Sequence, residues 1–515
     1  MAKDTKGTPA RDDDYLTPGD RRDPDYKDRP EPTERPISGL RLLGLLGGPV
    51  VAVLVLLTAA PEGMPLIAWH LVAMASWMVI WWLTEAIPIP ATALLPIVMM
   101  PLLGIDQIQP VAANYGHPLI FLFLGGFLLA AAMQHVGLHR RIALQIVSRI
   151  GTSPSRIILG FMLATAFLSM WISNTATTIM MFAVALSVVD FVAEQTDDEA
   201  TVRNFGVALM LSIAYSASIG GVGTLIGTPP NALLASFLQN TYQIEITFFN
   251  WMLLGVPVVA VMLPVSWLLL TRVLFPSHRI AIQDPGAVVD RELAALGRMS
   301  RGEKLVALVF LGAALGWIFR ALLVTWTGLP LNDTIIALLA ALILFAVPIS
   351  RAEGEFALDW EAARNVPWGV LLLFGGGLAL AGGFKSTGLA EWIGNAVAGV
   401  EVSTLVLILL VTVAIVYLTE ITSNTASTAT FLPVLAAVAV GLGLNPVILC
   451  VPVALGASMA FMMPVATPPN AIVFAYEQMQ LRDMVRAGFM LNLLAIAVSF
   501  GLFTLLAKLV FGVDF

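Results

Sequence analysis

The sequence predicts an all-α polytopic membrane protein, with about eleven transmembrane helices and two re-entrant helical hairpins arranged in two inverted repeats. Of its 515 residues, 58% are hydrophobic and only 12% are charged, whereas a soluble domain is about 25% charged. Apolar runs recur along the chain, and most are close to the roughly 20 residues with which a helix crosses a bilayer. The runs are solid blocks rather than alternating residues, which favours helices over a closed barrel.

Residues 1–36 differ from the rest in composition. Acidic and basic residues are interleaved with prolines in the stretch RDDDYLTPGDRRDPDYKDRPEPTERP, which cannot bury a core and lacks the apolar run of a signal peptide. We expect a disordered cytoplasmic extension. A polybasic lipid anchor is the alternative, but the acids among the bases count against it.

The apolar segments lie approximately at residues 37–60, 66–84, 91–105, 117–136, 153–193, 205–238, 249–275, 304–325, 331–349, 366–386, 402–441, 446–475 and 486–512. The first is interpreted as a transmembrane helix that precedes the repeats. Segments 153–193 and 402–441 are about twice too long for one crossing, and each has a polar cluster near its middle. We therefore predict a re-entrant hairpin in each, with the polar cluster at its tip. Two full crossings each is the alternative.

Three motifs recur in the same order. SNTATT at residues 173–178 returns as SNTAST at 423–428, and FLFLGGFLLA at 121–130 returns as LLLFGGGLAL at 371–380, both at an offset of 250 residues (423 − 173 and 371 − 121). GTPPN at 227–231 returns as ATPPN at 466–470, at an offset of 239 (466 − 227), because the shorter stretch 441–447 replaces the polar stretch 194–204. The sequence therefore predicts two repeats, residues 66–275 and 304–512.

The number of crossings sets the topology. Five crossings and one hairpin in each repeat make an odd number, so the second repeat enters from the opposite side and the hairpin tips meet near the bilayer midplane. The connector, residues 276–303, carries Arg279, Arg291, Arg298 and Arg301. By the positive-inside rule it is cytoplasmic, which places the N-terminus inside and the C-terminus outside.

The two SNT clusters offer hydroxyl and amide groups without net charge, beside helix ends whose backbone groups are free to bind ions. The paired prolines of each TPPN segment break a helix and release carbonyls such as those of Gly227 and Ala466. Such oxygens are hard ligands, suited to a hard cation such as Na⁺. A structural role is the alternative, because Ser and Thr often bond to a carbonyl of their own helix. The duplication in register favours binding.

The same motifs carry a resemblance. With the SNT clusters and IGTPPN at residues 226–231, the stretches TEAIPIPATALLP at 84–96 and ASMAFMMPVATPPNAIV at 457–473 make residues 39–512 resemble the divalent anion:sodium symporter family. That family carries Krebs-cycle di- and tricarboxylates or sulfate. The resemblance implies a homodimer, in which a scaffold holds a mobile transport domain, made of the hairpins and their neighbouring broken helices, that moves substrate by an elevator-like displacement.

The resemblance also implies the ligands. It places a first sodium site on Ser169, Ser173, Asn174 and the backbone of Gly227, and a second on Thr419, Thr422, Asn424 and the backbone of Ala466. Ser169 and Thr419 are again 250 residues apart (419 − 169), and each lies about one helical turn before its SNT serine. The implied substrate pocket consists of Ser173, Asn174, Thr175, Thr228, Pro229, Ser423, Asn424, Thr425, Thr467 and Pro468.

Neither the tips nor the TPPN segments contain Arg or Lys. A dianion in a low dielectric costs many kcal/mol unless its charge is paired, so bound cations and helix N-termini must supply positive charge. We infer that cations bind first and create the anion site. Glu420, whose counterpart in the first repeat is Met170, is expected to support the second hairpin rather than to carry protons.

The predicted function is sodium-coupled uptake of divalent anions, most simply C4-dicarboxylates such as succinate, malate and fumarate, across a prokaryotic inner (plasma) membrane. Its partners are the dianion, sodium ions, membrane lipid and a second copy of the chain, without nucleic acid or an organic cofactor. An enzyme is not expected, because the spans hold no nucleophile and base constellation. The alternatives are a sodium-independent dicarboxylate exchanger, a sulfate or citrate carrier of the same family, and an anion channel.

Overall fold

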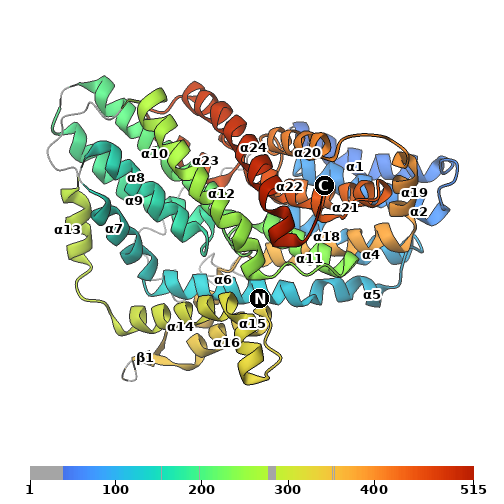
Figure 1. Ribbon diagram of the computed structural model, residues 1–515, viewed down its shortest axis with the longest axis horizontal. Coiled ribbons are helices and arrows are strands. Elements are labelled where there is room, and N and C mark those ends of the chain that lie inside the picture. The colour runs from blue at the N-terminus through green and yellow to red at the C-terminus, as the bar shows by residue number, and fades with distance from the viewer. Residues whose placement is uncertain are drawn as a thin grey trace, which may run out of the picture.

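The computed structural model describes residues 39–514 except residues 152, 197, 277–285, 351 and 353. It is helical almost throughout, and the strands of the described residues are one short antiparallel pair, β1 (Pro348–Ser350) and β2 (Glu355–Phe356). The predicted tail at residues 1–36 and residues 277–285 of the predicted connector lie outside the described residues. The helices form an elongated body, with α7 to α10 and α13 at one end and α1, α2 and α19 at the other (Figure 1).

The helices before the connector are α1 (Gly39–Leu57), α2 (Leu66–Thr84), α3 (Ile89–Thr92), α4 (Leu95–Leu102), α5 (Ile108–Ala113), α6 (Pro118–His135), α7 (Leu138–Ile150), α8 (Pro154–Ser169), α9 (Asn174–Ala193), α10 (Glu199–Gly221), α11 (Pro229–Tyr242) and α12 (Phe248–Leu268), which continues as a π-helix at Leu269–Leu274. The helices from the connector onward are α13 (Ala287–Ala295), α14 (Arg301–Ile318), α15 (Arg320–Thr327), α16 (Asp333–Ala346), α17 (Trp360–Arg364), α18 (Trp368–Ser386), α19 (Leu389–Val397), α20 (Thr404–Leu418), α21 (Asn424–Gly441), α22 (Val447–Ala457), α23 (Pro468–Phe474) and α24 (Leu481–Phe511).

Within the described residues, nine helices are long and apolar enough to cross a membrane, or ten if the bent pair α14 and α15 is one span. Five shorter apolar helices, which include α8, α16, α20 and α22, add to them. The predicted class, an all-α polytopic membrane protein, is confirmed. The count of about eleven crossings with two hairpins, and the division into repeats, stay predictions.

Several predicted segments are divided in the structure. Segment 91–105 forms α3 and α4, segment 205–238 forms α10 and α11, and segment 446–475 forms α22 and α23. Helices α3, α4, α11 and α23 each carry proline in their first two positions, where its missing N–H costs nothing and its fixed φ suits a helix start. The apolar composition therefore predicts where these segments lie, and the prolines explain where the helices within them begin.

Helices α10 and α22 are each surrounded by other helices. Nearly all of α10 and all of α22 are buried. The first packs against α8, α9 and α12, and the second against α20, α21 and α24. The backbones of α8 and α10 approach each other closely, since a Cβ added to Gly220 would lie 2.3 Å from the carbonyl oxygen of Ala166. This approach fixes the end of α8, which leads into the first SNT cluster.

The connector is held on α7 by its acidic residues. Glu303 forms a buried ion pair with Arg141, with a 2.6 Å contact to Nε, Glu292 pairs with Arg140, and Asp290 accepts a hydrogen bond of 2.5 Å from Ser148. The exposed bases of this region form no ion pair with the described residues; they are Arg149, Arg156, Arg272, Arg291, Arg298, Arg301 and Lys304.

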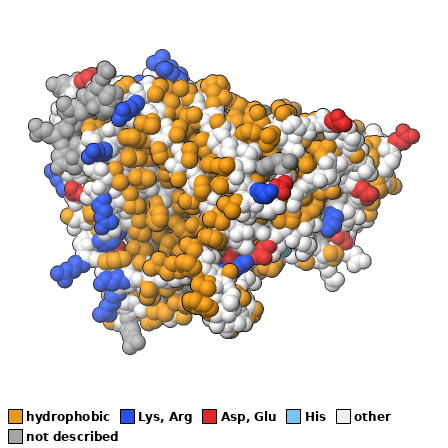
Figure 2. Space-filling view, viewed as in Figure 1, with side chains coloured by type: hydrophobic (Ala, Val, Ile, Leu, Met, Phe, Trp, Pro, Cys, Tyr) orange, Lys and Arg blue, Asp and Glu red, His pale blue; other side chains and the backbone are white. Residues whose placement is uncertain are grey.

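Figure 2 places this region beside the apolar surface. Hydrophobic side chains cover a broad continuous area of the visible face, and Lys and Arg side chains gather along its left border, where Figure 1 places α13 and α7. An apolar face bordered by exposed bases is typical of a surface that passes from acyl chains to lipid headgroups.

Replacement of Gly220 by alanine is expected to destabilise the protein by about 1–3 kcal/mol, because α8 must move away from the new methyl group. The matched control is Gly312→Ala in α14, where a Cβ would meet no atom within 4 Å; there the substitution is neutral or stabilising. Thermal unfolding of the purified variants in detergent tests this. Equal melting temperatures for the two variants would contradict the close approach of α8 and α10.

Candidate functional site

Both SNT clusters lie where one helix ends and the next begins. Helix α8 ends at Ser169 and α9 begins at Asn174, while α20 ends at Leu418 and α21 begins at Asn424. The serine of each cluster is the N-cap of the second helix, and the Ser173 hydroxyl accepts a hydrogen bond from the amide of Ala176 (3.2 Å). Each tip therefore presents the N-terminus of a long helix.

The TPPN segments begin α11 and α23, and their asparagines bind the chain that precedes them. Nδ2 of Asn231 donates to the carbonyls of Gly221 (3.1 Å) and Thr224 (2.8 Å). Nδ2 of Asn470 donates to the carbonyls of Ala460 (3.2 Å) and Met463 (3.0 Å). In both places the acceptors lie ten and seven residues before the asparagine. The same hydrogen-bond pattern thus recurs at the offset of the TPPN motifs.

A single cavity of about 1370 Å³ brings these four segments together. All residues of the predicted substrate pocket line it: Ser173, Asn174, Thr175, Thr228, Pro229, Ser423, Asn424, Thr425, Thr467 and Pro468. The remaining lining comes from the start of α1, the ends of α2 and α6, and residues between 359 and 370. The two polar clusters, 250 residues apart in the sequence, therefore face one space.

The first predicted sodium set has oxygens without donors. Ser173, Asn174 and Gly227 line the cavity, and Ser169 lies behind them, fully buried. The hydroxyl of Ser169 and the amide oxygen of Asn174 have no hydrogen-bond partner among the described residues. A Cβ on Gly221 would lie 2.9 Å from Oδ1 of Asn174 and 3.2 Å from the carbonyl oxygen of Gly227, so both oxygens border the same glycine. Buried acceptors without donors are costly, and a small cation would satisfy them.

The second predicted set is satisfied within itself. The buried Thr419 hydroxyl donates to Oδ1 of Asn424 (2.6 Å) and approaches the carbonyl oxygen of Ala457 (3.1 Å). The Thr422 hydroxyl bonds to the carbonyl of Leu418 (2.9 Å) and to the hydroxyl of Ser427 (2.6 Å). Thr422, Asn424 and Ala466 line the cavity, whereas Thr419 lies behind it. A cation at this set would share the amide oxygen of Asn424 with the Thr419 proton, or displace that proton toward the carbonyl of Ala457.

Two serines that the sequence analysis missed also line the cavity. Ser218 lies near the end of α10 and Ser458 directly after α22. The Ser218 hydroxyl is buried without a partner among the described residues, whereas the Ser458 hydroxyl donates to the carbonyl of Ala454 (3.1 Å). They are 240 residues apart (458 − 218), whereas the TPPN offset of 239 pairs Ser218 with Ala457 (457 − 218), so the repeat alone does not identify them.

Glu420 supports the second tip, as expected. Its buried carboxylate accepts hydrogen bonds from the amides of Phe461 (2.7 Å), Met462 (3.0 Å) and Met463 (3.1 Å), and from Nδ2 of Asn492 (2.7 Å). These amides belong to the irregular chain between α22 and α23. Bonds from amides to a carboxylate are stronger than those between neutral groups, so Glu420 ties the end of α20 to the second TPPN segment.

Positive side chains are scarce around the cavity. Within the described residues, Arg41 is the one Lys or Arg that lines it. Arg41 lies at the start of α1, and its guanidinium is 4.0 Å from the carboxylate of Glu85, just after α2. The segments with the predicted ligands contribute helix N-termini and neutral oxygens. Such a site attracts cations through its oxygens and can hold an anion where cations are already bound.

Comparisons with known proteins agree with the motifs. A family model described as the sodium:sulfate symporter transmembrane region matches residues 41–513. The sodium-dependent dicarboxylate transporter SdcS of Staphylococcus saprophyticus is 42% identical over 92% of this chain and 93% of its own length. SdcS of Staphylococcus aureus is 40% identical over 93% of this chain and 94% of its own length.

A solved structure is similar in fold. The crystal structure of the Alcanivorax borkumensis YdaH transporter, whose title describes an unusual topology, covers 85% of this chain and 98% of its own chain with a TM-score of 0.58. Its sequence identity is 15%, so this likeness concerns the fold alone. The family, in contrast, is shown by the match along nearly the whole sequence. This chain belongs to the sodium:sulfate symporter family, the divalent anion:sodium symporters that its SNT and TPPN motifs resemble.

Proposed function

We propose that this protein takes up C4-dicarboxylates across a prokaryotic plasma membrane, driven by sodium. The observation that carries the proposal is the cavity that joins both SNT clusters and both TPPN segments, with neutral oxygens and no base from any of the four. Relatives that are named sodium-dependent dicarboxylate transporters make a dicarboxylate the first candidate, and we propose succinate, malate and fumarate as its members. The sodium:sulfate symporter family, to which the chain belongs, makes sulfate a second candidate.

The charge of the substrate decides the mechanism. Helices α9, α21 and α11 begin at Asn174, Asn424 and Pro229, all of which line the cavity, and each helix N-terminus carries about half a positive charge. These partial charges do not neutralise a dianion in a low dielectric. Sodium at the two oxygen sets supplies the rest, so cations bind first and the anion follows.

The two sodium sets are proposed to differ. The first, with Ser169, Ser173, Asn174 and Gly227, has acceptors that already lack donors and receives its ion with little rearrangement. The second, with Thr419, Thr422, Asn424 and Ala466, first loses the hydrogen bond from Thr419 to Asn424. A net reorganisation cost at the second set makes its sodium affinity lower.

The architecture implied by the family completes the proposal. Two copies of the chain form a dimer, and in each the hairpins of residues 153–193 and 402–441 move with their neighbouring broken helices in an elevator-like displacement. The repeats, residues 66–275 and 304–512, are inverted in the membrane, and the first transmembrane helix precedes them.

Orientation follows from the connector. Gly302 at the start of α14 lies against Val136, and the neighbouring Gln134 and His135 line the cavity. Part of the cavity lining therefore lies beside the connector and its exposed bases. By the positive-inside rule we take this side of the molecule as cytoplasmic, with the N-terminus inside and the C-terminus outside.

Uptake of labelled succinate into proteoliposomes tests the function. An inward sodium gradient is expected to drive accumulation, which choline in place of sodium abolishes, and unlabelled malate and fumarate compete where sulfate does not. Equal uptake in choline would rule out obligatory coupling, and competition by sulfate alone would establish the second candidate. A single-channel conductance would point to a channel.

Replacement of Ser169 by alanine is expected to raise the sodium concentration for half-maximal uptake about tenfold, since one lost oxygen ligand corresponds to about 1.4 kcal/mol. Stability should change little, because the hydroxyl has no hydrogen bond to lose. The matched control is Thr165→Val, one turn earlier on α8, whose hydroxyl is likewise buried and unpartnered among the described residues. An equal effect of both substitutions would show that Ser169 is no sodium ligand.

Cysteine labelling tests the orientation, since the one native thiol, Cys450, is buried. A membrane-impermeant maleimide is expected to modify Arg298→Cys only in inside-out vesicles. Leu329→Cys, exposed just after α15 at the other end of the α14 and α15 pair, should react in intact cells. The opposite pattern would reverse the proposed topology.

A further inference from the structure

We propose that Trp171 is a positioning residue, which seats the first SNT tip on α12 and α14 and thereby fixes the first sodium set. This inference rests on the proposed function. Trp171 lies two residues before Ser173, and its side chain is buried. Its indole stacks on Phe248 (ring centroids 6.0 Å apart, 20° between planes) and on Trp317 (6.4 Å, 10°), and meets Phe310 edge-on (4.9 Å, 83°). We name Phe248, Phe310 and Trp317 the aromatic seat.

The seat is itself a fixed structure. Phe248 begins α12, and Trp317 lies in the last turn of α14. Their rings stack on each other with centroids 4.4 Å apart and 17° between planes. Aromatic pairs contribute beyond the area that they bury, so the tip rests on rings that are already held in place.

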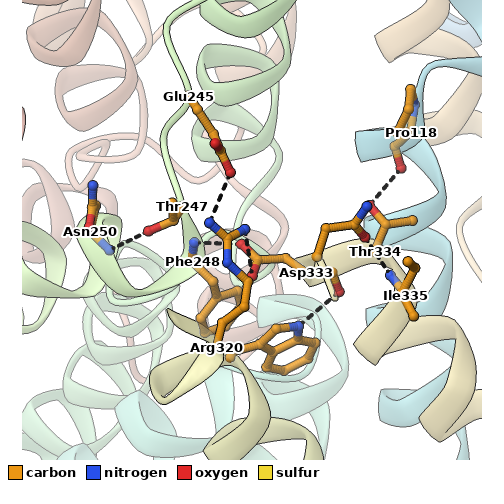
Figure 3. Close-up of polar contacts among 11 residues, drawn as sticks. Pro118, Glu245, Thr247, Phe248, Asn250, Arg320, Asp333, Thr334 and Ile335 are labelled. Atoms are coloured by element: carbon orange, nitrogen blue, oxygen red, sulfur yellow. Dashed lines mark hydrogen bonds and ion pairs between the residues drawn. The ribbon is translucent and has the colours of Figure 1, made fainter. Parts of the chain in front are cut away.

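Asp333 holds both stacked rings. Its carboxylate accepts a hydrogen bond from the amide of Phe248 (2.9 Å), and its carbonyl accepts one from Nε1 of Trp317 (3.0 Å). Figure 3 shows the Arg320 guanidinium between Glu245 and Asp333, with contacts of 3.0 Å and 3.3 Å. A continuous set of contacts therefore runs from Arg320 and Asp333 through the seat to Trp171 at the tip.

The second tip has no such seat among the residues that the structure describes. The position that corresponds to Trp171 at the SNT offset of 250 residues (421 − 171) is Ile421, whose side chain is 72% exposed and lines the cavity. Trp171 is only 8% exposed. The first tip is thus fixed from outside its own helices, and its sodium set is the one with unpartnered oxygens.

Positioning by Trp171 matters more for the first sodium set, because no hydrogen bond joins its ligand side chains to one another among the described residues. In the second set, hydrogen bonds tie Thr419 to Asn424 and Thr422 to Ser427. Ser169 and the amide oxygen of Asn174 have no such bond among the described residues, although they must point at one ion. Ligands that are held before binding spend less free energy on ordering. Trp171 lies between these two residues in the sequence. Its packing holds the tip in place where hydrogen bonds between the ligands do not.

The test measures sodium binding without transport. Purified protein is melted in detergent over a series of sodium chloride concentrations, with choline chloride keeping the ionic strength constant. A bound ion stabilises the folded protein by RT ln(1 + [Na⁺]/Kd), so the melting temperature rises as sodium exceeds its dissociation constant. Trp171→Leu is expected to raise the half-saturating sodium concentration about fivefold, in the same direction as Ser169→Ala. Trp171→Phe, which keeps a ring for stacking, should restore most of the affinity. Trp326→Leu, the same substitution at an exposed tryptophan of α15, is the matched control and should leave the affinity unchanged.

Coupling to the seat is tested by Asp333→Ala, alone and with Trp171→Leu. If Asp333 acts through the seat, the double variant shows little more loss of sodium affinity than Trp171→Leu alone. Additive losses would overturn the role of Asp333, and an unchanged sodium midpoint in Trp171→Leu would overturn the proposal. If Trp171→Leu does not fold, Trp317→Leu takes its place, because it weakens the same ring stack from α14. A raised half-saturating sodium concentration supports the proposal, and an unchanged one overturns it. Absence of any sodium effect on the wild-type protein would refute the proposed function instead.

Discussion

A helix that stops inside a bilayer leaves backbone groups that only the protein can satisfy, and the cavity depends on how this constraint is met. Asn231 and Asn470 bind the carbonyls of the chain that follows α10 and α22. Glu420 binds three successive amides before α23. These side chains keep the breaks stable in lipid.

The two halves share this frame but differ in the residues around it. Met170 stands where the second half has Glu420, and the Thr224 hydroxyl bonds to the Met170 carbonyl instead. Trp171, buried in the aromatic seat, stands where the second half has the exposed Ile421. One tip is therefore held by packing against distant helices, and the other by a carboxylate and by hydrogen bonds of its own. The two SNT clusters are thus alike in sequence but differ in the residues around them. Two ions bound at these clusters would therefore have different environments.

The sequence predicted the parts of the site that depend on local structure. Paired prolines require a helix to begin, and the serine and asparagine of each SNT cluster suit an N-cap and a first turn. It did not predict the amphipathic helices α7, α13 and α19, whose charged or polar faces hide them from a search for apolar runs. Nor did it predict the bend of 85° between α14 and α15, where neither proline nor glycine marks the change of direction. The contact of Trp171 with the aromatic seat joins residues 171, 248, 310 and 317, and no local sequence pattern relates such distant positions.

The bend has a consequence for the site. It brings Arg320, the first residue of α15, to the carboxylate of Asp333 at the start of α16, so that one acid binds both Arg320 and the first amide of α12. Thr334, the residue after Asp333, donates to the carbonyl of Pro118 at the start of α6 (3.1 Å), while residues in the last turn of α6 line the cavity. Helix α6, with 18 residues and a length of about 27 Å, therefore has one end beside Thr334 and the other at the cavity lining. Movement of the first tip relative to α12 and α14, as in the elevator-like displacement proposed above, would break the contacts of Trp171 with Phe248, Phe310 and Trp317. The rings proposed to order the sodium ligands would then also stabilise the conformation described here.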